Sequence, residues 1–557
     1  MARFPAVLFT VAVIAAAPRL EAAPPVRAPV VVTLVIDQLA AWIAEERFAS
    51  LPPEGGFARL RKEGTSATLV YRHAVTDTAP GHATLYTGAD PRDHGIFANE
   101  VIDRADGKKL SILRDAGTKV ITADGPREAA SSSLAPLLLP TLADALRAAN
   151  PRATIVSLAI KERAALPGGG RAPTATLWFD VGLGRFITSS AVSTAFPTWA
   201  APLSGADMMV AEKSRVWTPL DAAFVAAHAA TPDAQPGEGD LDGIGTSFPH
   251  AMAAATNLPH AWRATPFADE KLIQLAIAAV EARDVAQPML LAISLSANDY
   301  ISHVFGPDSW EAWDELRRLD VALATFFAAL DARLGAAGWS LLLSGDHGAA
   351  MLPEAASLAR PWCKRATADR WQRPCGDAGR IIPNELAARL RKHSDLVAGV
   401  ADPYIYLVPA TAANAERRRA AIESLRAELL RQPGIATVVA TRPAAARCPT
   451  GDSVEALVCR SIPAGGLGAR SAAGELYVAL RPGWFFDPEY VVGKGMSHGS
   501  PYLYDRAVPL VVRAPGRASA GRVVAAPQGP ATFAVTAARL LGIEPPKGAT
   551  GAASLAR

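Results

Sequence analysis

The sequence predicts an α/β fold with a mainly parallel sheet and helices on both of its faces. Continuous apolar, β-branched runs of strand length recur along the chain, and amphipathic helical patterns separate them. A strand that is apolar along its whole length is typical of a parallel sheet covered on both faces. The alternation of such strands with helices indicates an α/β architecture. The composition, 50% hydrophobic and 20% charged, is that of a globular protein.

The expected strands of this sheet are short apolar runs. The first, residues 28–36, reads APVVVTLVI and is too short for a typical helix. The other expected strands are 153–160, 289–295, 339–343 and 508–512.

Two helices have clear sequence signals. One begins at a capping box formed by Thr141 and Asp144 and ends before Pro151. The longer one ends at Gly335, and its apolar residues recur every three or four positions along one face. These apolar residues are Leu316, Leu319, Leu323, Phe326, Leu330 and Leu334.

Two stretches interrupt the alternation of strands and helices. Residues 168–262 are rich in Gly, Pro, Ala and Thr without a sustained period, and we interpret them as an insertion over one end of the sheet. Residues 362–474 combine strand-like and charged helical segments and suggest a small inserted α+β subdomain. The expected division is a signal peptide at 1–22, core segments at 28–167, 263–361 and 475–557, and insertions at 168–262 and 362–474.

The N-terminus has the pattern of a secretory signal. Arg3 precedes the apolar run 6–17 and the small-residue stretch 21–25, so cleavage is expected near Ala22. The run is shorter than the about 20 residues that span a bilayer. An uncleaved anchor is the alternative. No other stretch is apolar enough to span, so we expect a periplasmic or secreted protein without a membrane span after signal removal.

The cysteines lie in two local pairs, Cys363 with Cys375 and Cys448 with Cys459. Neither spacing matches the C-x-x-C of a zinc site. Disulfides are favoured in an exported chain. Three pairings are possible, and the two local ones are preferred because they close the shortest loops; buried free thiols are the alternative.

The charge balance argues against a nucleic-acid partner. Lys and Arg number 56 against 53 Asp and Glu, and the formal net charge is +3 with no basic block. A duplex-binding surface requires a concentration of positive charge that this pattern does not provide. We therefore expect a small-molecule ligand and no nucleic acid duplex.

Aspartates and histidines follow several of the apolar runs. Ligands of parallel sheets gather at the carboxyl ends of the strands, and a buried carboxylate there is costly unless it is paired or binds a metal. Each residue alone has an ordinary reading, as a helix cap, an i,i+4 contact or an Asx turn. Together they predict a metal site, with zinc favoured over manganese or iron because imidazole and carboxylate ligands are mixed. The set comprises Asp37, Asp299, His303, Asp346, His347 and His498.

Thr78 is the candidate nucleophile. Pro80 and Gly88 bracket a short helix, which places Thr78 at its N-cap or just before it. A plain capping threonine is the alternative. Next to a metal, however, the free N–H groups and dipole of a helix N-terminus favour an alkoxide and a bound phosphate.

These residues carry a family resemblance. The segment TAPGH from Thr78 to His82, the HGI that begins at His94, and Asn99 resemble the nucleophile segment of the type I phosphodiesterase/nucleotide pyrophosphatase branch of the alkaline phosphatase superfamily. Within this branch the chain is most similar to the monomeric, threonine-nucleophile, phosphate-irrepressible bacterial alkaline phosphatases. The likeness runs from Asp37 to about Pro546 and is loose over the two insertions. It implies an alkaline-phosphatase-like fold and a monomer.

The resemblance also implies two Zn²⁺ ions and a phosphothreonine intermediate formed on Thr78. Asn99 would donate its side-chain amide to a phosphoryl oxygen. One zinc would be held by Asp299, His303 and His498, and the other by Asp37, Asp346, His347 and the Thr78 oxygen. Ser302 stands where the family pattern leads us to expect glycine, which puts the path between Asp299 and His303 in doubt but not the ligands.

Lys161 and Arg163 separate two candidate reactions. The resemblance implies that both reach phosphoryl oxygens, and residues two apart in an extended segment face the same side. A phosphate monoester carries more charge on its terminal oxygens than a diester, so this pair favours a phosphatase that acts on small-molecule phosphate monoesters. A solvated strand end is the alternative reading of the pair. A phosphodiesterase or nucleotide pyrophosphatase on the same metals is the nearest rival function.

Two further functions fit less well. Sulfatases of the superfamily use a modified Cys or Ser in a Cys/Ser-x-Pro-x-Arg motif, and the segment from Thr78 to His82 lacks both the modifiable residue and the arginine. An inactive exported protein that binds phosphate or metal would not need the nucleophile together with every ligand position.

Overall fold

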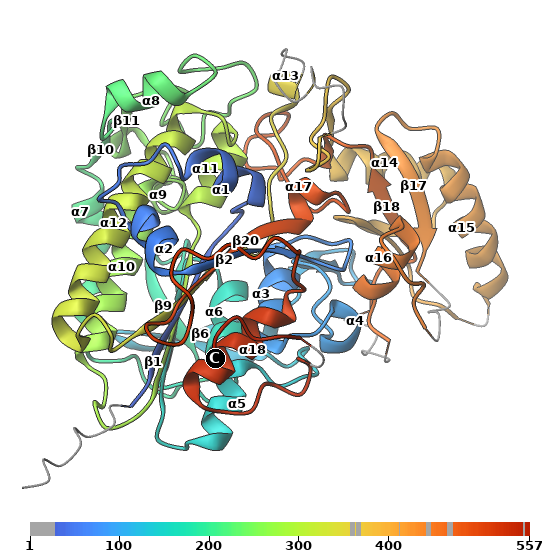
Figure 1. The fold of residues 1–557 in the computed structure, drawn as a ribbon. Coiled ribbons are helices and arrows are strands. Elements are labelled where there is room, and N and C mark those ends of the chain that lie inside the picture. The colour runs from blue at the N-terminus through green and yellow to red at the C-terminus, as the bar shows by residue number, and fades with distance from the viewer. Residues whose placement is uncertain are drawn as a thin grey trace, which may run out of the picture.

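The computed structural model describes residues 28–356, 363, 369–411, 413–441, 447–464, 472–549 and 552–557. The expected signal peptide, residues 1–22, lies outside this part of the chain. A ten-stranded sheet forms the centre of the molecule (Figure 1). In spatial order its strands are β2 (Thr65–Val70), β20 (Ala507–Arg513), β13 (Ser340–Ser344), β1 (Val30–Ile36), β12 (Met289–Leu295), β7 (Thr154–Ala159), β8 (Ala175–Asp180), β9 (Arg185–Ser189), β5 (Arg114–Thr122) and β6 (Gly125–Ser132).

The central strands β13, β1, β12, β7 and β8 run parallel, which confirms the predicted α/β class. The two edges are antiparallel: β20 and β2 on one side, and β9, β5 and β6 on the other. All five expected strands lie in this sheet. Strands β8 and β9 belong to it as well, although they fall within 168–262, where the sequence analysis predicts only an insertion.

Helices cover both faces of the sheet because its central strands are apolar on both sides. In β1, Val32 and Leu34 pack into different clusters from their neighbours Val31 and Val35. One face is covered by α1 (Ala41–Arg47), α2 (Gly56–Glu63), α10 (Pro266–Glu281), α11 (Ala297–Phe305) and α12 (Trp310–Leu334). The other is covered by α3 (Thr78–Thr87), α5 (Leu142–Ala149) and α18 (Ala531–Leu541), and α6 (Glu162–Gly169) packs beside α3.

The predicted helix signals are confirmed with one shift. Helix α12 ends at Gly335, and α5 has the predicted capping box, in which Asp144 N donates to Thr141 Oγ1 and Thr141 N donates to Asp144 Oδ2. Asp77 occupies the N-cap position of α3 without a side-chain hydrogen bond to the helix, so Thr78 is its first residue and neither its N-cap nor the residue before it. The sequence prediction therefore placed the start of this helix one or two residues late.

A smaller α+β unit packs against the core and appears in orange in Figure 1. Helices α14 and α15 cover one face of its antiparallel sheet, and Tyr404 on the other face contacts Phe97 of the core. One of its strands, β18, lies beyond residue 474, the expected end of the subdomain. The strands are β15 (Val397–Ala401), β16 (Tyr404–Leu407), β18 (Leu476–Leu480) and β17 (Ile435–Ala440), and the helices are α14 (Pro383–His393), α15 (Ala415–Leu429) and α16 (Val454–Ser461).

Short elements complete the described chain. The helices are α4 (Pro91–His94), α7 (Met208–Glu212), α8 (Ala222–His228), α9 (Leu258–Trp262), α13 (Pro353–Ala356) and α17 (Leu503–Arg506). The strand pairs are β3 (Glu100–Ile102) with β4 (Lys109–Ser111), β10 (Val216–Trp217) with β11 (His250–Ala251), and β14 (Gly379–Ile381) with β19 (Trp484–Phe486). Within the described ranges, no helix has the length and apolar character needed to cross a bilayer.

The preferred cysteine pairing is confirmed. Cys363 is bonded to Cys375 and Cys448 to Cys459, so none of the four cysteines is free. Each bond closes a loop of similar length, with sequence separations of 12 and 11. A crosslink of this kind stabilises a protein chiefly by restricting its unfolded chain.

We expect replacement of Cys448 and Cys459 by serine to lower the free energy of unfolding by about 2–4 kcal/mol, because the crosslink no longer restricts the unfolded chain. Denaturant unfolding of the wild type and the double variant measures this difference. Thiol titration of the unreduced, unfolded wild type is the control, and four reactive thiols there would contradict the pairing.

Candidate active site

The candidate site lies where three neighbouring parallel strands end. Asp37 follows β1, which is paired with β12 on one side and β13 on the other. Asp299 lies in α11, just after β12, and Asp346 with His347 follows β13. The adjacent strand ends therefore bring these side chains together, as the sequence analysis predicts. His498 joins them from a loop that precedes α17.

Glycine allows the nucleophile helix to approach this strand edge. A Cβ atom on Gly81 would lie 2.2 Å from the backbone oxygen of Asp346, so a larger residue would push α3 away from β13. Thr78, the first residue of α3, is consequently only 1% exposed and lies beside the carboxylates. Asn99 lies next to it, and its Oδ1 accepts a hydrogen bond from Ala79 N at 2.8 Å. This contact leaves the Nδ2 group of Asn99 as the donor for a ligand.

Two overlapping groups of side chains have the geometry of metal sites. The ligand atoms of Asp299, His303 and His498 all lie within 4.8 Å of one another, and those of Asp37, Asp299 and His347 do likewise. Asp299 is thus common to both groups. The second group differs from the expected set, in which Asp346 stands instead of Asp299. Asp346 Oδ2 lies 3.5 Å from His347 Nε2.

Unsatisfied buried atoms support metal binding at these groups. Both carboxylate oxygens of Asp37, Oδ2 of Asp346 and Nε2 of His347 are buried without a hydrogen bond of good geometry. Lys161, the cation nearest to Asp37, is shared with Asp299, so one ammonium group faces several buried carboxylates, which is costly without further positive charge. Oxygen and imidazole donors converging in this way fit divalent cations.

Each histidine is oriented by a backbone carbonyl. The Nδ1 atoms of His303, His347 and His498 lie 2.7, 3.0 and 2.9 Å from the carbonyl oxygens of Met496, Gly348 and Thr76, respectively. An Nδ1–H that donates to a carbonyl fixes the tautomer and leaves Nε2 with a lone pair. The Nε2 atoms of the three rings are therefore free to bind a metal ion.

Gln38 and His82 are site residues that the sequence analysis did not identify. Gln38 has a left-handed backbone, with φ of 64°, and donates from its backbone N to Asp346 Oδ1 and from Nε2 to Asp299 Oδ1. It therefore ties together the carboxylates that follow two different strands. His82 Nδ1 lies 3.2 Å from Asp346 Oδ2 and 2.9 Å from the backbone oxygen of Thr78. The TAPGH motif was the only sequence signal for His82.

Lys161 lies among the carboxylates. Its Nζ is 2.6 Å from Asp37 Oδ2, 2.5 Å from Asp299 Oδ2 and 3.2 Å from Thr78 Oγ1. Arg163 has a weaker contact, 3.9 Å from Glu162 Oε2. The extended-segment argument for this pair is wrong, because α6 begins at Glu162 and only its cap, Lys161, has extended backbone. Both side chains nevertheless line the same cavity.

The charges of these groups stabilise one another. Burial disfavours the charge on Asp299, yet His303 and Lys161 hold the pKa of its carboxyl well below the ordinary value. Burial likewise disfavours the charge on Lys161, but Asp299 and Asp37 raise its pKa above the ordinary value. The pKa of His498 is raised against the effect of burial by Asp299 and Asp77. Asp299 and Lys161 therefore stabilise each other's charge.

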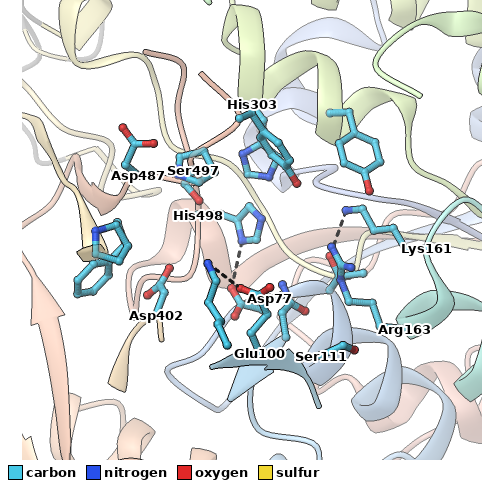
Figure 2. A pocket seen from close by; sticks show the side chains of 18 of the residues that line it. Asp77, Glu100, Ser111, Lys161, Arg163, His303, Asp402, Asp487, Ser497 and His498 are labelled. Atoms are coloured by element: carbon cyan, nitrogen blue, oxygen red, sulfur yellow. Dashed lines mark hydrogen bonds and ion pairs between the residues drawn. The ribbon is translucent and has the colours of Figure 1, made fainter. Parts of the chain in front are cut away.

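A cavity of about 310 Å³ opens onto Thr78, Asn99 and the two histidines His303 and His498. Figure 2 shows Lys161 and Arg163 on one side of this cavity and the carboxylates Asp402 and Asp487 on the other, with His303 and His498 between them. The cavity therefore has a cationic side, formed by Lys161 and Arg163. A ligand with an anionic group would place that group near Lys161 and Arg163.

Comparison with known proteins identifies relatives of this chain. The model of the family described as type I phosphodiesterase/nucleotide pyrophosphatase matches residues 31–500. Alkaline phosphatase PhoV of Synechococcus elongatus is 34% identical over 335 residues, which is 59% of this chain and 60% of that protein. A Myroides odoratus protein named calcium-transporting ATPase is 29% identical over 502 residues, 86% of each chain. The fold matches that of wild-type alkaline phosphatase PafA with a TM-score of 0.77 at 24% identity, covering 96% of this chain and 99% of that one.

Gly495 places the His498 loop against α11. It has φ of 69°, and a Cβ atom there would lie 1.9 Å from the backbone oxygen of His303. We expect Gly495→Ala to displace this loop and to weaken metal binding by about 10- to 100-fold, the usual effect of losing a group that orients a metal ligand. Metal content after dialysis against a chelator measures the change.

Gly493→Ala is the matched control, because Gly493 also has a positive φ, 80°, but a Cβ atom added there would meet no atom within 4 Å. Equal metal loss in the two variants would show that backbone strain, rather than contact with His303, accounts for the effect.

Proposed function

The chain belongs to the type I phosphodiesterase/nucleotide pyrophosphatase family, and on this basis we propose that it is a two-zinc alkaline phosphatase that hydrolyses phosphate monoesters through a phosphothreonine intermediate. The observation that carries the proposal is the convergence of Thr78, Asn99, Lys161 and Arg163 on one cavity beside two groups of metal-type ligands. The names of the relatives PhoV and PafA support the same activity.

Thr78 is the proposed nucleophile. Its Oγ1 would attack phosphorus, the ester alkoxide would leave, and water would then hydrolyse the phosphothreonine. The first turn of α3 helps because its free N–H groups and dipole stabilise negative charge at this end. The protein named calcium-transporting ATPase suggests a different phosphoryl-transfer chemistry, but transport ATPases form their phosphoenzyme on an aspartate. A threonine in this position supports a phosphatase instead.

The donor set suits two Zn²⁺ ions. Asp299, His303 and His498 would hold one ion, and Asp37, Asp346, His347 and the Thr78 oxygen would hold the other. Bound ions would stabilise the charge on the attacking and leaving oxygens of an in-line displacement. The buried atoms of Asp37 and His347 that lack a hydrogen bond of good geometry support this assignment.

Asn99, Lys161 and Arg163 are the proposed contacts of the phosphoryl group. Asn99 would donate from Nδ2, since its Oδ1 is held by Ala79. The two cations would bind the remaining oxygens, and the greater charge of a monoester makes it the preferred substrate. The alternative activity, diester or pyrophosphate hydrolysis on the same metals, would make less use of this pair.

An exported, monomeric enzyme fits these features best. Both disulfides close within the described chain and need no partner molecule. Such bonds persist in oxidising compartments, which supports a periplasmic or secreted location. The N-terminal signal pattern agrees with this proposal.

We expect Thr78→Ala to retain its metals and fold but to lower kcat by about 10³-fold or more, because a covalent nucleophile is removed while the ligands remain. Steady-state hydrolysis of an aryl phosphate, with metal analysis of the same samples, measures the loss. Thr87→Ala at the other end of α3 is the control and is expected to keep nearly full activity. Near-native turnover by metal-loaded Thr78→Ala would refute the assignment of the nucleophile.

We expect the double replacement of Lys161 and Arg163 by alanine to lower kcat/KM for an aryl phosphate monoester steeply, since loss of one such donor costs about 10²- to 10³-fold. The matching diester should lose far less, because it draws less on these charges. The losses caused by the separate Lys161→Ala and Arg163→Ala substitutions should not add up to the loss in the double variant, because both cations contact one anion.

Metal content must be measured in the same samples, because Lys161 also contacts Asp37 and Asp299. Equal losses for monoester and diester with metals retained would show that the pair is structural and would remove the residue-level support for a monoesterase.

A further inference from the structure

Arg263 lies at the edge of the active-site cavity, directly after α9. Its guanidinium carbon stands 4.4 Å from the ring centre of Tyr300 and 5.4 Å from that of Tyr490. Its Nη1 donates to the Tyr300 hydroxyl at 3.2 Å. The two rings are themselves packed edge to face, 5.8 Å apart, and Tyr490 packs against His303. The guanidinium is therefore held in a defined plane next to the candidate metal site.

The charge of Arg263 has no counterion in the described part of the chain. Its Nε is buried without a hydrogen-bond partner, and none of the ion pairs found there includes it. Other partly buried arginines nearby are paired with carboxylates: Arg215 lies 2.6 Å from Glu270, and Arg318 lies 2.6 Å from Asp314. A partly buried cation without a partner is costly unless an anion binds beside it.

The neighbouring cations are already assigned. Lys161 contacts Asp37 and Asp299, and Arg163 is the proposed contact of the transferred phosphoryl group. Arg163 and Arg263 both line the main cavity and also a second one of about 260 Å³, whose lining includes Trp178 and Phe179. Arg263 therefore lies where the two cavities meet, beside the proposed phosphoryl site, and it is not one of the proposed contacts of the phosphoryl group.

We propose that Arg263, held by Tyr300 and Tyr490, binds a second anionic group, a carboxylate or a phosphate, on the organic part of the substrate. The proposal rests on the phosphatase function above and narrows its substrates to esters with two anionic groups. A planar guanidinium binds both kinds of oxyanion through paired N–H groups, and stacking on Tyr300 fixes its orientation. Asp487 lies on the opposite side of the cavity from Lys161 and Arg163 (Figure 2) and disfavours an anion there, so the second group would be directed towards Arg263.

Binding of non-hydrolysable phosphonates to the metal-loaded enzyme tests this proposal without turnover. Calorimetry would compare phenylphosphonate with the meta and para isomers of carboxyphenylphosphonate and of benzenediphosphonate. We expect at least one doubly anionic compound to bind the wild type about tenfold more tightly than phenylphosphonate, in line with one charge-assisted hydrogen-bonded contact. The carboxylate and phosphonate arms show which anion Arg263 selects.

Arg263→Gln should abolish this tenfold preference, and Arg263→Lys should keep part of it, because lysine retains the charge but not the planar fork. Arg215→Gln is the matched control: its guanidinium is paired with Glu270 and lines neither cavity, so the preference should persist. The inference is overturned if no doubly anionic isomer has an advantage, or if Arg263→Gln retains it. A wild type that hydrolyses no phosphate monoester would instead refute the proposed function, and the binding comparison still reports on Arg263.

Discussion

The concentration of buried negative charge at the ends of three adjacent strands is the constraint on which the rest of the site depends. Asp37, Asp299 and Asp346 are fully buried, and parallel pairing of β1 with β12 and β13 forces them together. Carboxylates this close repel one another unless cations lie between them. Lys161 and the proposed metal ions supply that positive charge, and the glycines and carbonyls around them hold the donors in place.

The sequence predicted the centre of the sheet and the residues at its edge because both follow from simple patterns. A strand buried on both faces is mainly apolar, so the charged residues that follow it, such as Asp37 or Asp346, mark the carboxyl end. It did not predict β8 and β9, which lie in a stretch without periodicity. The left-handed backbone of Gln38 and the stacking of Arg263 on Tyr300 have no sequence signature, since they arise from contacts between distant segments.

Different parts of the fold contribute to the cavity. Thr78, Lys161 and His303 come from the elements of the sheet and its helices, whereas Asp402 comes from the smaller α+β unit and Arg263 directly follows α9. In the proposed function the first set would act on the phosphoryl group, and the residues around it would form the environment of the organic group. Substrate choice would then vary with the inserted segments while the reaction stays the same.

The most direct test of the two-metal phosphatase is to add zinc stepwise to metal-stripped wild-type protein. Bound zinc and kcat/KM for an aryl phosphate monoester and its matching diester would be measured on the same samples. The account predicts that activity returns as two ions bind and that the monoester is the better substrate throughout. Full activity in the metal-free protein, or a preference for the diester at full metal loading, would contradict it.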